Sequence, residues 1–269
     1  QVFGPQGQVI RQWGSMCRLY DEGRPGCVDP DGGGPLAEGD GQFNEPWGIA
    51  VDDRRGFVYV ADTWNHRIQK FTREGQFITK WGAYASTGGE LTNPGAFWGP
   101  RALVVDEEGN LYVTDTGNKR VQKFSPDGTF LGQWGGAGVI EGRFDEPVGL
   151  ARDKNGNFYV ADTWNQRVQK FDKDFNYLGQ WPIFGWSGQS VVNKPYLAVD
   201  DQGNVYASDP ENYRILVFDE GGAFKAVFGQ YGNDASSFAL PTGLAVDQQG
   251  NLYVADADNH RILKFPPLR

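Results

Sequence analysis

Cysteine, histidine and methionine are scarce in this chain, which has two cysteines, two histidines and one methionine among its 269 residues. So small a supply of thiol and imidazole ligands argues against a metal centre built from Cys and His. No metal and no other cofactor is therefore predicted.

Positive charge is also in short supply. Lys and Arg total 25 against 34 Asp and Glu, which gives a formal net charge of −9. Such a balance repels the phosphate backbone, so nucleic acid is not expected as a partner. Residues 20–41 are especially acidic, with six carboxylates against the single Arg24. An RNA-binding surface is therefore the weaker of the possible functions.

Long apolar runs are missing as well. No stretch approaches the roughly 20 apolar residues that a membrane-spanning helix needs, so this segment is not expected to enter a membrane. The chain opens on Gln1 without a basic and then apolar leader. We expect it to be a processed product or one part of a longer protein.

The two cysteines stand close together in the stretch "CRLYDEGRPGC", as Cys17 and Cys27. Two free thiols and a loop disulfide are both compatible with this spacing. The disulfide is favoured because closing such a loop would stabilise a Gly- and Pro-rich segment. A disulfide would in turn indicate an oxidising compartment, either extracytoplasmic or at the cell surface.

The sequence repeats a unit of four short segments. One copy reads "PWGIAVD" (46–52), "VYVAD" (58–62), "TWNHRIQKF" (63–71) and "REGQFITKWG" (73–82). Each segment is apolar or alternating, and Asp- and Gly-containing turns separate the first two segments, which predicts four strands per unit. Repeated four-stranded units of this kind predict an all-β fold, a β-propeller. Further copies begin at Pro100, Pro147, Lys194 and Pro241.

Five units can be counted, and together they predict a single domain over residues 1–269. The last unit stops after "RILKF", before a fourth strand. The N-terminal "QVFGPQGQVIRQWG" matches "KFTREGQFITKWG" (70–82) and places Trp13 on Trp81. We therefore predict that the N-terminal segment completes the last blade and closes the ring, which would cover both edge strands.

These units resemble the NHL-repeat family of β-propeller proteins. The pattern "PxGIAVD…GNxYVADTxNxRIQKF" is matched closely in four of the five units, and an Asn-x-Arg tripeptide is present in each. The resemblance implies a propeller, and because members are often six-bladed, six blades stay possible. The tripeptides are Asn65-His66-Arg67, Asn118-Lys119-Arg120, Asn165-Gln166-Arg167, Asn212-Tyr213-Arg214 and Asn259-His260-Arg261.

The Asp and Arg of the repeat recur in every unit, whereas a catalytic group is needed once. We interpret them as a structural ion pair with a turn. His66 and His260 share a position that holds Lys, Gln or Tyr in other units, which predicts a solvent-facing position. The recurring residues are Asp62, Asp115, Asp162, Asp209 and Asp256, with Arg67, Arg120, Arg167, Arg214 and Arg261.

Function is expected where the units differ. Two insertions, residues 15–45 and 83–99, precede adjacent units and should lie on one face. Aromatic residues that do not recur in register gather there, and the loops add Tyr84, Phe97, Phe184 and Tyr231. Flat rings suit sugar faces or peptide side chains, although these rings would serve equally to pack the insertions down. The predicted ligand-binding residues are Trp47, Trp64, Trp98, Arg101, Trp164 and Trp186.

These observations predict a non-catalytic binding or scaffold module that recognises a protein or glycan ligand. We expect a monomeric domain of a larger surface or extracytoplasmic protein. The alternatives are a metal-dependent, lactonase- or lyase-like propeller enzyme and an RNA-binding propeller. The family resemblance implies that such lyases hold their metal with histidines of the channel, and the first strands here contain none. No catalytic residue is predicted.

Overall fold

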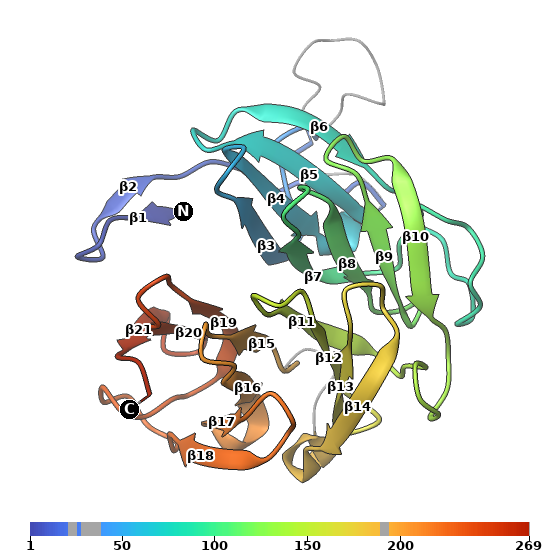
Figure 1. The fold of residues 1–269 in the computed structure, drawn as a ribbon. Helices are drawn as coiled ribbons and strands as arrows, with labels where there is room; N and C mark the ends of the chain where they lie inside the picture. The colour runs from blue at the N-terminus through green and yellow to red at the C-terminus, as the bar shows by residue number, and fades with distance from the viewer. Residues whose placement is uncertain (21–25, 28–38, 189–193, 269) are drawn as a thin grey trace. The chain divides into compact units, whose positions relative to one another are not determined.

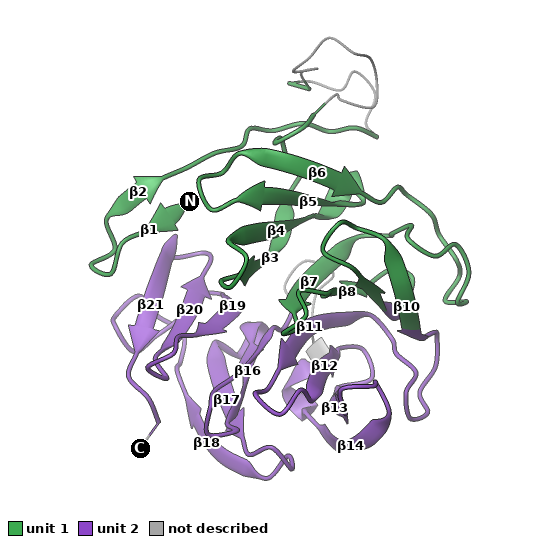
Figure 2. Ribbon diagram, turned by 45° about the horizontal axis from the view of Figure 1, so that its top comes forward, with its two compact units in different colours: residues 1–118, 122–133 green, residues 119–121, 134–269 purple. Residues whose placement is uncertain are grey.

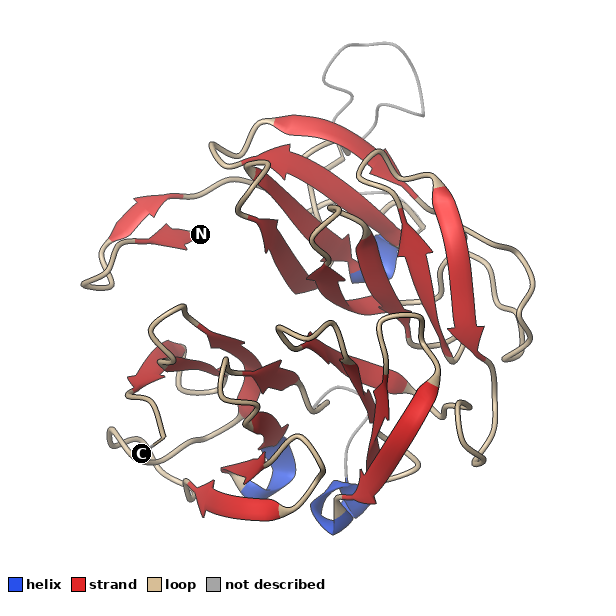
Figure 3. Cartoon of the chain, in the orientation of Figure 1, coloured by secondary structure: helices blue, strands red, loops and turns tan. Residues whose placement is uncertain are grey.

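The computed structural model describes residues 1–20, 26–27, 39–188 and 194–268 (Figure 1). It is an all-β propeller fold made of five consecutive antiparallel blades, and almost all of its regular structure is strand (Figure 3). The predicted fold class is therefore confirmed. Three short 3-10 segments complete the regular structure of the described residues, namely η1 (Thr63–Asn65), η2 (Phe184–Gly188) and η3 (Pro210–Asn212).

Two compact units divide the chain (Figure 2). Unit 1 comprises residues 1–118 and 122–133, and unit 2 comprises residues 119–121 and 134–269. The first two blades are four-stranded sheets in which the second and third strands are the most buried and the fourth is the outer one. Their strands are β3 (Pro46–Asp52), β4 (Phe57–Asp62), β5 (Arg67–Thr72) and β6 (Phe77–Trp81), then β7 (Pro100–Val105), β8 (Leu111–Asp115), β9 (Arg120–Phe124) and β10 (Phe130–Gly135).

Blades three and four are also four-stranded, and the fifth has three strands. Their strands are β11 (Pro147–Arg152), β12 (Phe158–Asp162), β13 (Arg167–Phe171), β14 (Tyr177–Pro182), β15 (Leu197–Val199), β16 (Val205–Asp209), β17 (Arg214–Phe218), β18 (Phe224–Phe228), β19 (Pro241–Val246), β20 (Leu252–Asp256) and β21 (Arg261–Phe265).

The hairpin between the first two strands of a blade follows from its Asp, Gly and Asn. In the second blade the carboxylate of Asp106 accepts hydrogen bonds from the backbone and side-chain amides of Asn110, at 2.7 and 2.9 Å. Gly109 takes the left-handed conformation that the turn requires, with φ of 87°. The same Asp-to-Asn hydrogen bonds close the corresponding turns at Asp153, Asp200 and Asp247.

Gly48 and Gly149 are each the third residue of a first strand, at points where a neighbouring blade's backbone approaches closely. A Cβ atom on Gly48 of β3 would lie 1.9 Å from the carbonyl oxygen of Arg101 in β7. In unit 2, a Cβ on Gly149 of β11 would lie 2.9 Å from the backbone of Tyr196, which precedes β15. A side chain at either position would force the two strands apart, which explains the Gly of the "GIAVD" segment.

The N-terminal residues form a hairpin of their own, in which β1 (Val2–Phe3) pairs with β2 (Val9–Arg11). The N-terminal segment is predicted to pair with the last blade through residues 8–14. This pairing is not present in the described structure, where the sheet of β19, β20 and β21 has three strands. Closure of the ring by the N-terminal segment therefore stays a prediction.

Trp13 nevertheless packs as a fourth-strand tryptophan does. Its ring centroid lies 6.0 Å from that of Phe71, and a Cβ on Gly75 would meet the indole at 2.6 Å. Trp81 makes the equivalent contacts with Phe124, at 5.9 Å, and with Gly128, at 2.7 Å. The alignment of Trp13 with Trp81 is thus supported by packing within unit 1.

Apolar side chains from neighbouring blades form the core of each unit. In unit 1, Tyr59, Phe97 and Phe124 are fully buried in one cluster, and in unit 2 Tyr159, Val205 and Trp186 share another. No helix among the described residues has the length and apolar character that crossing a membrane would require.

Candidate ligand-binding loops

One end of each blade carries both its second-to-third-strand connection and the loop that leads into its first strand, and we call this the loop end. In unit 1 a hydrogen bond joins these two loops directly: the backbone amide of Trp64 in η1 donates to the carbonyl of Asn44, at 3.2 Å. In unit 2 the amide of Trp164 likewise donates to the carbonyl of Asp145, at 3.1 Å. The predicted insertions and irregular aromatics can therefore be placed at the loop ends of their own units.

The recurring Asp anchors each loop end from a buried position. Asp62 Oδ1 accepts the backbone N–H of Asn44 at 2.7 Å, and Oδ2 accepts from Asn65 at 2.9 Å, Arg67 Nε at 2.7 Å and Gln69 at 3.1 Å. Asp162 holds Asp145, Asn165, Arg167 and Gln169 in the same way. The structural ion pair expected from the sequence is present, and all of its hydrogen bonds serve the scaffold.

The recurring Asn fixes the point at which each connecting loop leaves the fourth strand. Asn65 Nδ2 donates to the carbonyl of Cys17 at 2.8 Å, and its Oδ1 accepts the amide of Leu19 at 2.9 Å. In the next blade, Asn118 binds the carbonyl of Ala85 and the amide of Thr87, both at 2.9 Å. We call this two-sided contact the Asn clasp.

A Gln on the third strand fixes the other end of the same loops. The Oε1 atom of Gln69 accepts the amide of Gly41 at 2.9 Å, and that of Gln122 accepts the amide of Gly95 at 2.9 Å. Both insertions of unit 1 thus begin at an Asn clasp and end at a Gln contact. In unit 2, Asn165 and Gln169 hold Gly138 and Gly142 in the same manner around a short loop.

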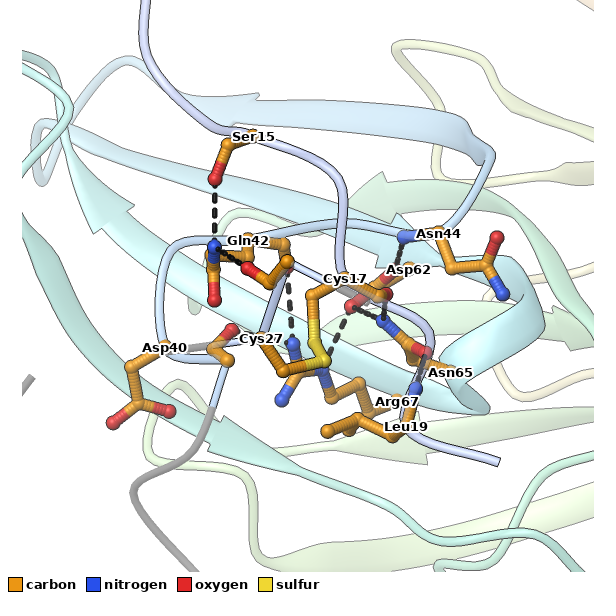
Figure 4. The surroundings of a disulfide bond; sticks show 12 residues. Ser15, Cys17, Leu19, Cys27, Asp40, Gln42, Asn44, Asp62, Asn65 and Arg67 are labelled. Atoms are coloured by element: carbon orange, nitrogen blue, oxygen red, sulfur yellow. Dashed lines mark hydrogen bonds and ion pairs between the residues drawn. A yellow bond between two sulfur atoms is a disulfide. The ribbon is translucent and has the colours of Figure 1, made fainter. Parts of the chain in front are cut away.

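A disulfide joins Cys17 and Cys27 and ties the start of the first insertion, as predicted (Figure 4). Cys17 is buried beside the Asn clasp, and no free cysteine occurs in the part of the chain that the structure describes. Gln42 adds two further ties, because its side-chain amide donates to Ser15 Oγ and to the carbonyl of Gly26, both at 2.7 Å.

Trp64 and Trp98 lie at the loop ends of unit 1. Trp64 is half-buried and its indole N–H donates to the carboxylate of Glu45 at 3.1 Å. Trp98 is exposed and its ring covers Gly117, where a Cβ would lie 2.5 Å from the indole. Gly117 stands in the second blade where Trp64 stands in the first, so the missing side chain makes room for Trp98.

Trp47 and Arg101 contact each other, and Arg101 is buried, whereas the sequence suggested a ligand-facing position. The guanidinium carbon of Arg101 lies 4.0 Å from the ring centroid of Trp47, in cation–π geometry. Arg101 is only 4% exposed. Such burial gives no support to the direct contact with an acidic ligand group that the sequence suggested.

Unit 2 contains one predicted site residue at the surface and one in the core. Trp164 is 51% exposed, with the Lys194 ammonium 5.0 Å from its ring centroid and 3.0 Å from the Glu146 carboxylate. Trp186 is 2% exposed, and its indole N–H donates to the carbonyl of Ser208 at 3.1 Å. This burial contradicts the surface position expected for Trp186, which folds back from η2 into the core of unit 2.

Phe97, expected among the loop aromatics, is also a core residue. It is fully buried and packs on Phe124, at 5.5 Å between ring centroids. Phe43, Phe144 and Phe238 stand in the same place in their own units, three residues before the starting proline. Recognising this register in the sequence would have assigned Phe97 to the core.

His66, expected to face solvent, is instead the buried floor of an aromatic cluster in unit 1. Its ring centroid lies 4.8 Å from that of Tyr84 and 5.3 Å from that of Tyr20, and Trp64 meets it edge-on at 6.3 Å. The backbone N–H of Gly99 donates to Nδ1 at 3.1 Å. Burial lowers the pKa of His66 to about 4. The expectation was wrong for His66, whereas His260 is exposed.

Sequence reasoning missed Tyr20 and the role of His66, although one signal was available. Tyr84 follows the fourth-strand Trp81 by the same spacing as Tyr231 follows Phe228. In the fourth blade Tyr231 packs on Tyr213, which stands where His66 stands in the first, with 4.9 Å between centroids. The residue at that position therefore packs against the loop rather than pointing into solvent.

Metal-ligating side chains do not converge within the described ranges, where no group of three or more His, Cys, Asp or Glu residues is placed to hold an ion.

Comparison with known proteins identifies the repeats. The NHL repeat pattern matches residues 43–71, 97–124, 144–171 and 238–265. NHL repeat-containing protein 3 of Mus musculus is 33% identical over 144 residues, which cover 52% of this chain and 38% of that protein. Peptidyl-glycine alpha-amidating monooxygenase B of Xenopus laevis is 38% identical over 94 residues, covering 34% of this chain and 10% of that protein. The chain thus spans well under half the length of both relatives.

A solved structure of a streptogramin B lyase has a similar fold. The two superpose with a TM-score of 0.57 at 16% sequence identity, over 83% of this chain and 69% of the lyase. At this level of identity the likeness extends to the fold alone.

Proposed function

Because the chain belongs to the NHL-repeat family of β-propellers, we propose that it is a non-catalytic binding module that recognises a protein or glycan ligand with its loop ends. The single observation that carries the proposal is the gathering of partly or largely exposed aromatic rings on and beside loops that are held at both ends. Tyr20 lies within the first insertion, and Tyr84 and Trp98 flank the second. Trp64 and Trp164 lie in the second-to-third-strand connections of their own blades. Loops fixed on a rigid scaffold present a ligand with a preformed surface.

Two features weigh against the alternative functions. First strands without histidine offer no imidazole ligands for lyase-like chemistry in the channel, although an amidating monooxygenase is among the relatives. The net charge of −9 opposes binding of RNA phosphates. The disulfide supports an extracytoplasmic or cell-surface setting, because such bonds persist in oxidising compartments.

Glycan and peptide arrays probed with the 269-residue chain test this function. We expect a ligand whose binding is lost in the double variant Trp64→Ala/Trp98→Ala. Phe224→Ala is the matched control, since Phe224 is an exposed aromatic residue on the outer strand β18, away from the loop ends. Binding that survives the double change, or that Phe224→Ala removes equally, would place the site away from the loop ends. If the chain converts a substrate and a chelator abolishes that activity, the chain is an enzyme and the proposal of a non-catalytic binding module is wrong.

A further inference from the structure

The first blade carries an uncovered apolar patch on its first strand. Ile49 and Val51 lie on one face of β3 and are 63% and 50% exposed. Leu103, Leu150 and Leu197 hold the place of Ile49 in the next three blades and are only 6%, 4% and 4% exposed. The face that carries this position is therefore buried in those blades and open in the first.

A neighbouring blade covers that face where both blades belong to one unit. In unit 1, Leu103 and Val113 of the second blade pack in a cluster with side chains from all four strands of the first blade. In unit 2 the third blade covers the fourth with the equivalent side chains. Complete cover therefore needs a blade with all four strands. The covering residues are Ala50, Tyr59, Ala61, Ile68 and Trp81 in unit 1, and Ala151, Tyr159, Ala161, Val168 and Trp181 in unit 2.

The N-terminal hairpin has the register of the two outer strands of a blade. Its strands β1 and β2 form a sheet of their own and stand apart from the sheet of β3 to β6 in Figures 1 and 2. The pairing of β1 with β2 repeats that of β5 with β6, including a shift of register at the same point. Phe3 thus holds the place of Phe71, and the place of Ile68 falls directly before residue 1. The opposed residues are Phe3 with Val9 and Val2 with Arg11 in the hairpin, and Phe71 with Phe77 and Lys70 with Thr79 in the first blade.

This incomplete blade covers the first blade only in part. Trp13, in the fourth-strand position, packs on Phe71, with 6.0 Å between ring centroids. The sheet of β1 and β2 has neither a first nor a second strand among the described residues. Ile49 and Val51 lie where those two strands would pack, which explains their exposure.

We propose that the first blade and the N-terminal hairpin together accept a donor β-hairpin, which leads into Gln1 and supplies the first and second strands of a further blade. The donor pairs with the free edge of β1 and places the Ala, Tyr and Ile side chains of the repeat on Ile49 and Val51. Strand addition of this kind combines backbone hydrogen bonds with the burial of alternate side chains. A donor with the sequence of the repeat fits, because those residue types cover the same face in both units. Without a donor, β2 is available for the pairing with β21 that the sequence predicts.

The test adds a donor to the 269-residue chain by fusing a second copy of residues 241–262 directly ahead of Gln1. This segment forms the first two strands of the last blade and the start of its third strand. We expect the fusion to unfold about 5 °C or more above the parent chain, because it buries an apolar face that the parent exposes. The amides of Val2 and Phe3 that face the donor should exchange roughly tenfold more slowly, as measured by NMR. The added copy contains the equivalents of the covering residues, namely Ala245, Tyr253, Ala255 and Ile262.

The matched control fusion carries Tyr253→Asp and Ile262→Asp in the added copy alone, and it should show neither effect. Ile49→Asp in the first blade should remove the thermal gain of the intact fusion. Leu131→Asp should leave that gain unchanged, because Leu131 is a half-exposed residue on the outer strand β10. Equal unfolding temperatures of the intact and control fusions, a gain that survives Ile49→Asp, or unchanged exchange in β1 would overturn the inference.

Discussion

A buried carboxylate must be compensated, and in four of the blades an Asn and an Arg side chain donate to the recurring Asp. These carboxylates are Asp62, Asp162, Asp209 and Asp256. Burial raises the pKa of Asp62, and the charge of Arg67 with the hydrogen bonds from Asn44 and Asn65 opposes that rise. Removing one partner would leave a charged group in a dry site with fewer donors, which costs more than the pair contributes. The Asp, Asn and Arg residues of "DTWNHRIQKF" (62–71), which could be taken for a catalytic site, are therefore explained by their contribution to stability.

Arg67→Ala and Arg167→Ala should each lower the free energy of unfolding by about 1–3 kcal/mol, because each arginine also binds two loop carbonyls. Trp64→Ala and Trp164→Ala should cost less, since these rings are partly or largely exposed. Urea unfolding of the four variants measures the difference. A larger loss in the tryptophan pair would assign both rings to the core and remove them from the loop surface.

His66 should make stability depend on pH. Its pKa in the folded chain lies near 4, below the usual value of 6.5, so the unfolded chain binds more protons between these two values. Stability from this residue is complete above pH 6.5 and is lost as the pH falls toward 4, by an amount on the order of 3 kcal/mol. His66→Gln should flatten the unfolding free energy across that window. A parent and variant with parallel pH profiles would show that His66 is not buried as described.

At the scale of the loop, insertions are tolerated because both of their ends are fixed. The first insertion leaves the scaffold at Cys17 and returns at Gly41, held by Asn65 and Gln69. The length of chain between the two contacts can therefore change without altering the blade. The disulfide adds a third tie within the first insertion.

Protein made in an oxidising compartment should contain no titratable thiol. The variant Cys17→Ser/Cys27→Ser should lose about 2–4 kcal/mol of stability, as expected for removal of a loop disulfide. It should also loosen Tyr20, which lies inside the closed loop and packs on His66. Thiol titration and thermal unfolding measure the first two effects. Two reactive thiols in such a preparation would remove the support for an extracytoplasmic location.

Strands and turns could be predicted from the sequence because their determinants are local. The alternation of "LYVTD" (111–115) and the Asp–Gly–Asn turn that precedes it act within a few residues, and the strand bounds agree with them. The burial of Trp186, Arg101 and His66 depends on how loops fold back on the blades. That information is distributed over residues far apart in the chain, so an aromatic residue in a loop cannot be assigned to surface or core from its position alone.

At the scale of the whole molecule, the last blade differs from the others in lacking a fourth strand within its sheet. Strand β21 ends a three-stranded sheet, while the other four blades have a fourth strand. Trp13 already makes the contacts of a fourth-strand tryptophan with Phe71 and Gly75. A sheet edge left open exposes a row of unpaired amides and carbonyls, which proteins generally avoid. Residues 8–14 remain the segment whose sequence matches the missing strand.

We therefore predict that residues 8–14 pair with β21 in solution and that deleting residues 1–12 releases this edge. The deletion keeps Trp13 and its packing on Phe71, so it separates strand pairing from the tryptophan contact. Loss of a paired strand should lower stability by a few kcal/mol and speed hydrogen exchange at the amides of Arg261–Phe265 that face the missing strand. Trp13→Ala is the companion variant and should destabilise unit 1 while leaving those amides protected. Fast exchange at the same amides in the parent chain would show that the N-terminal segment does not complete the last blade.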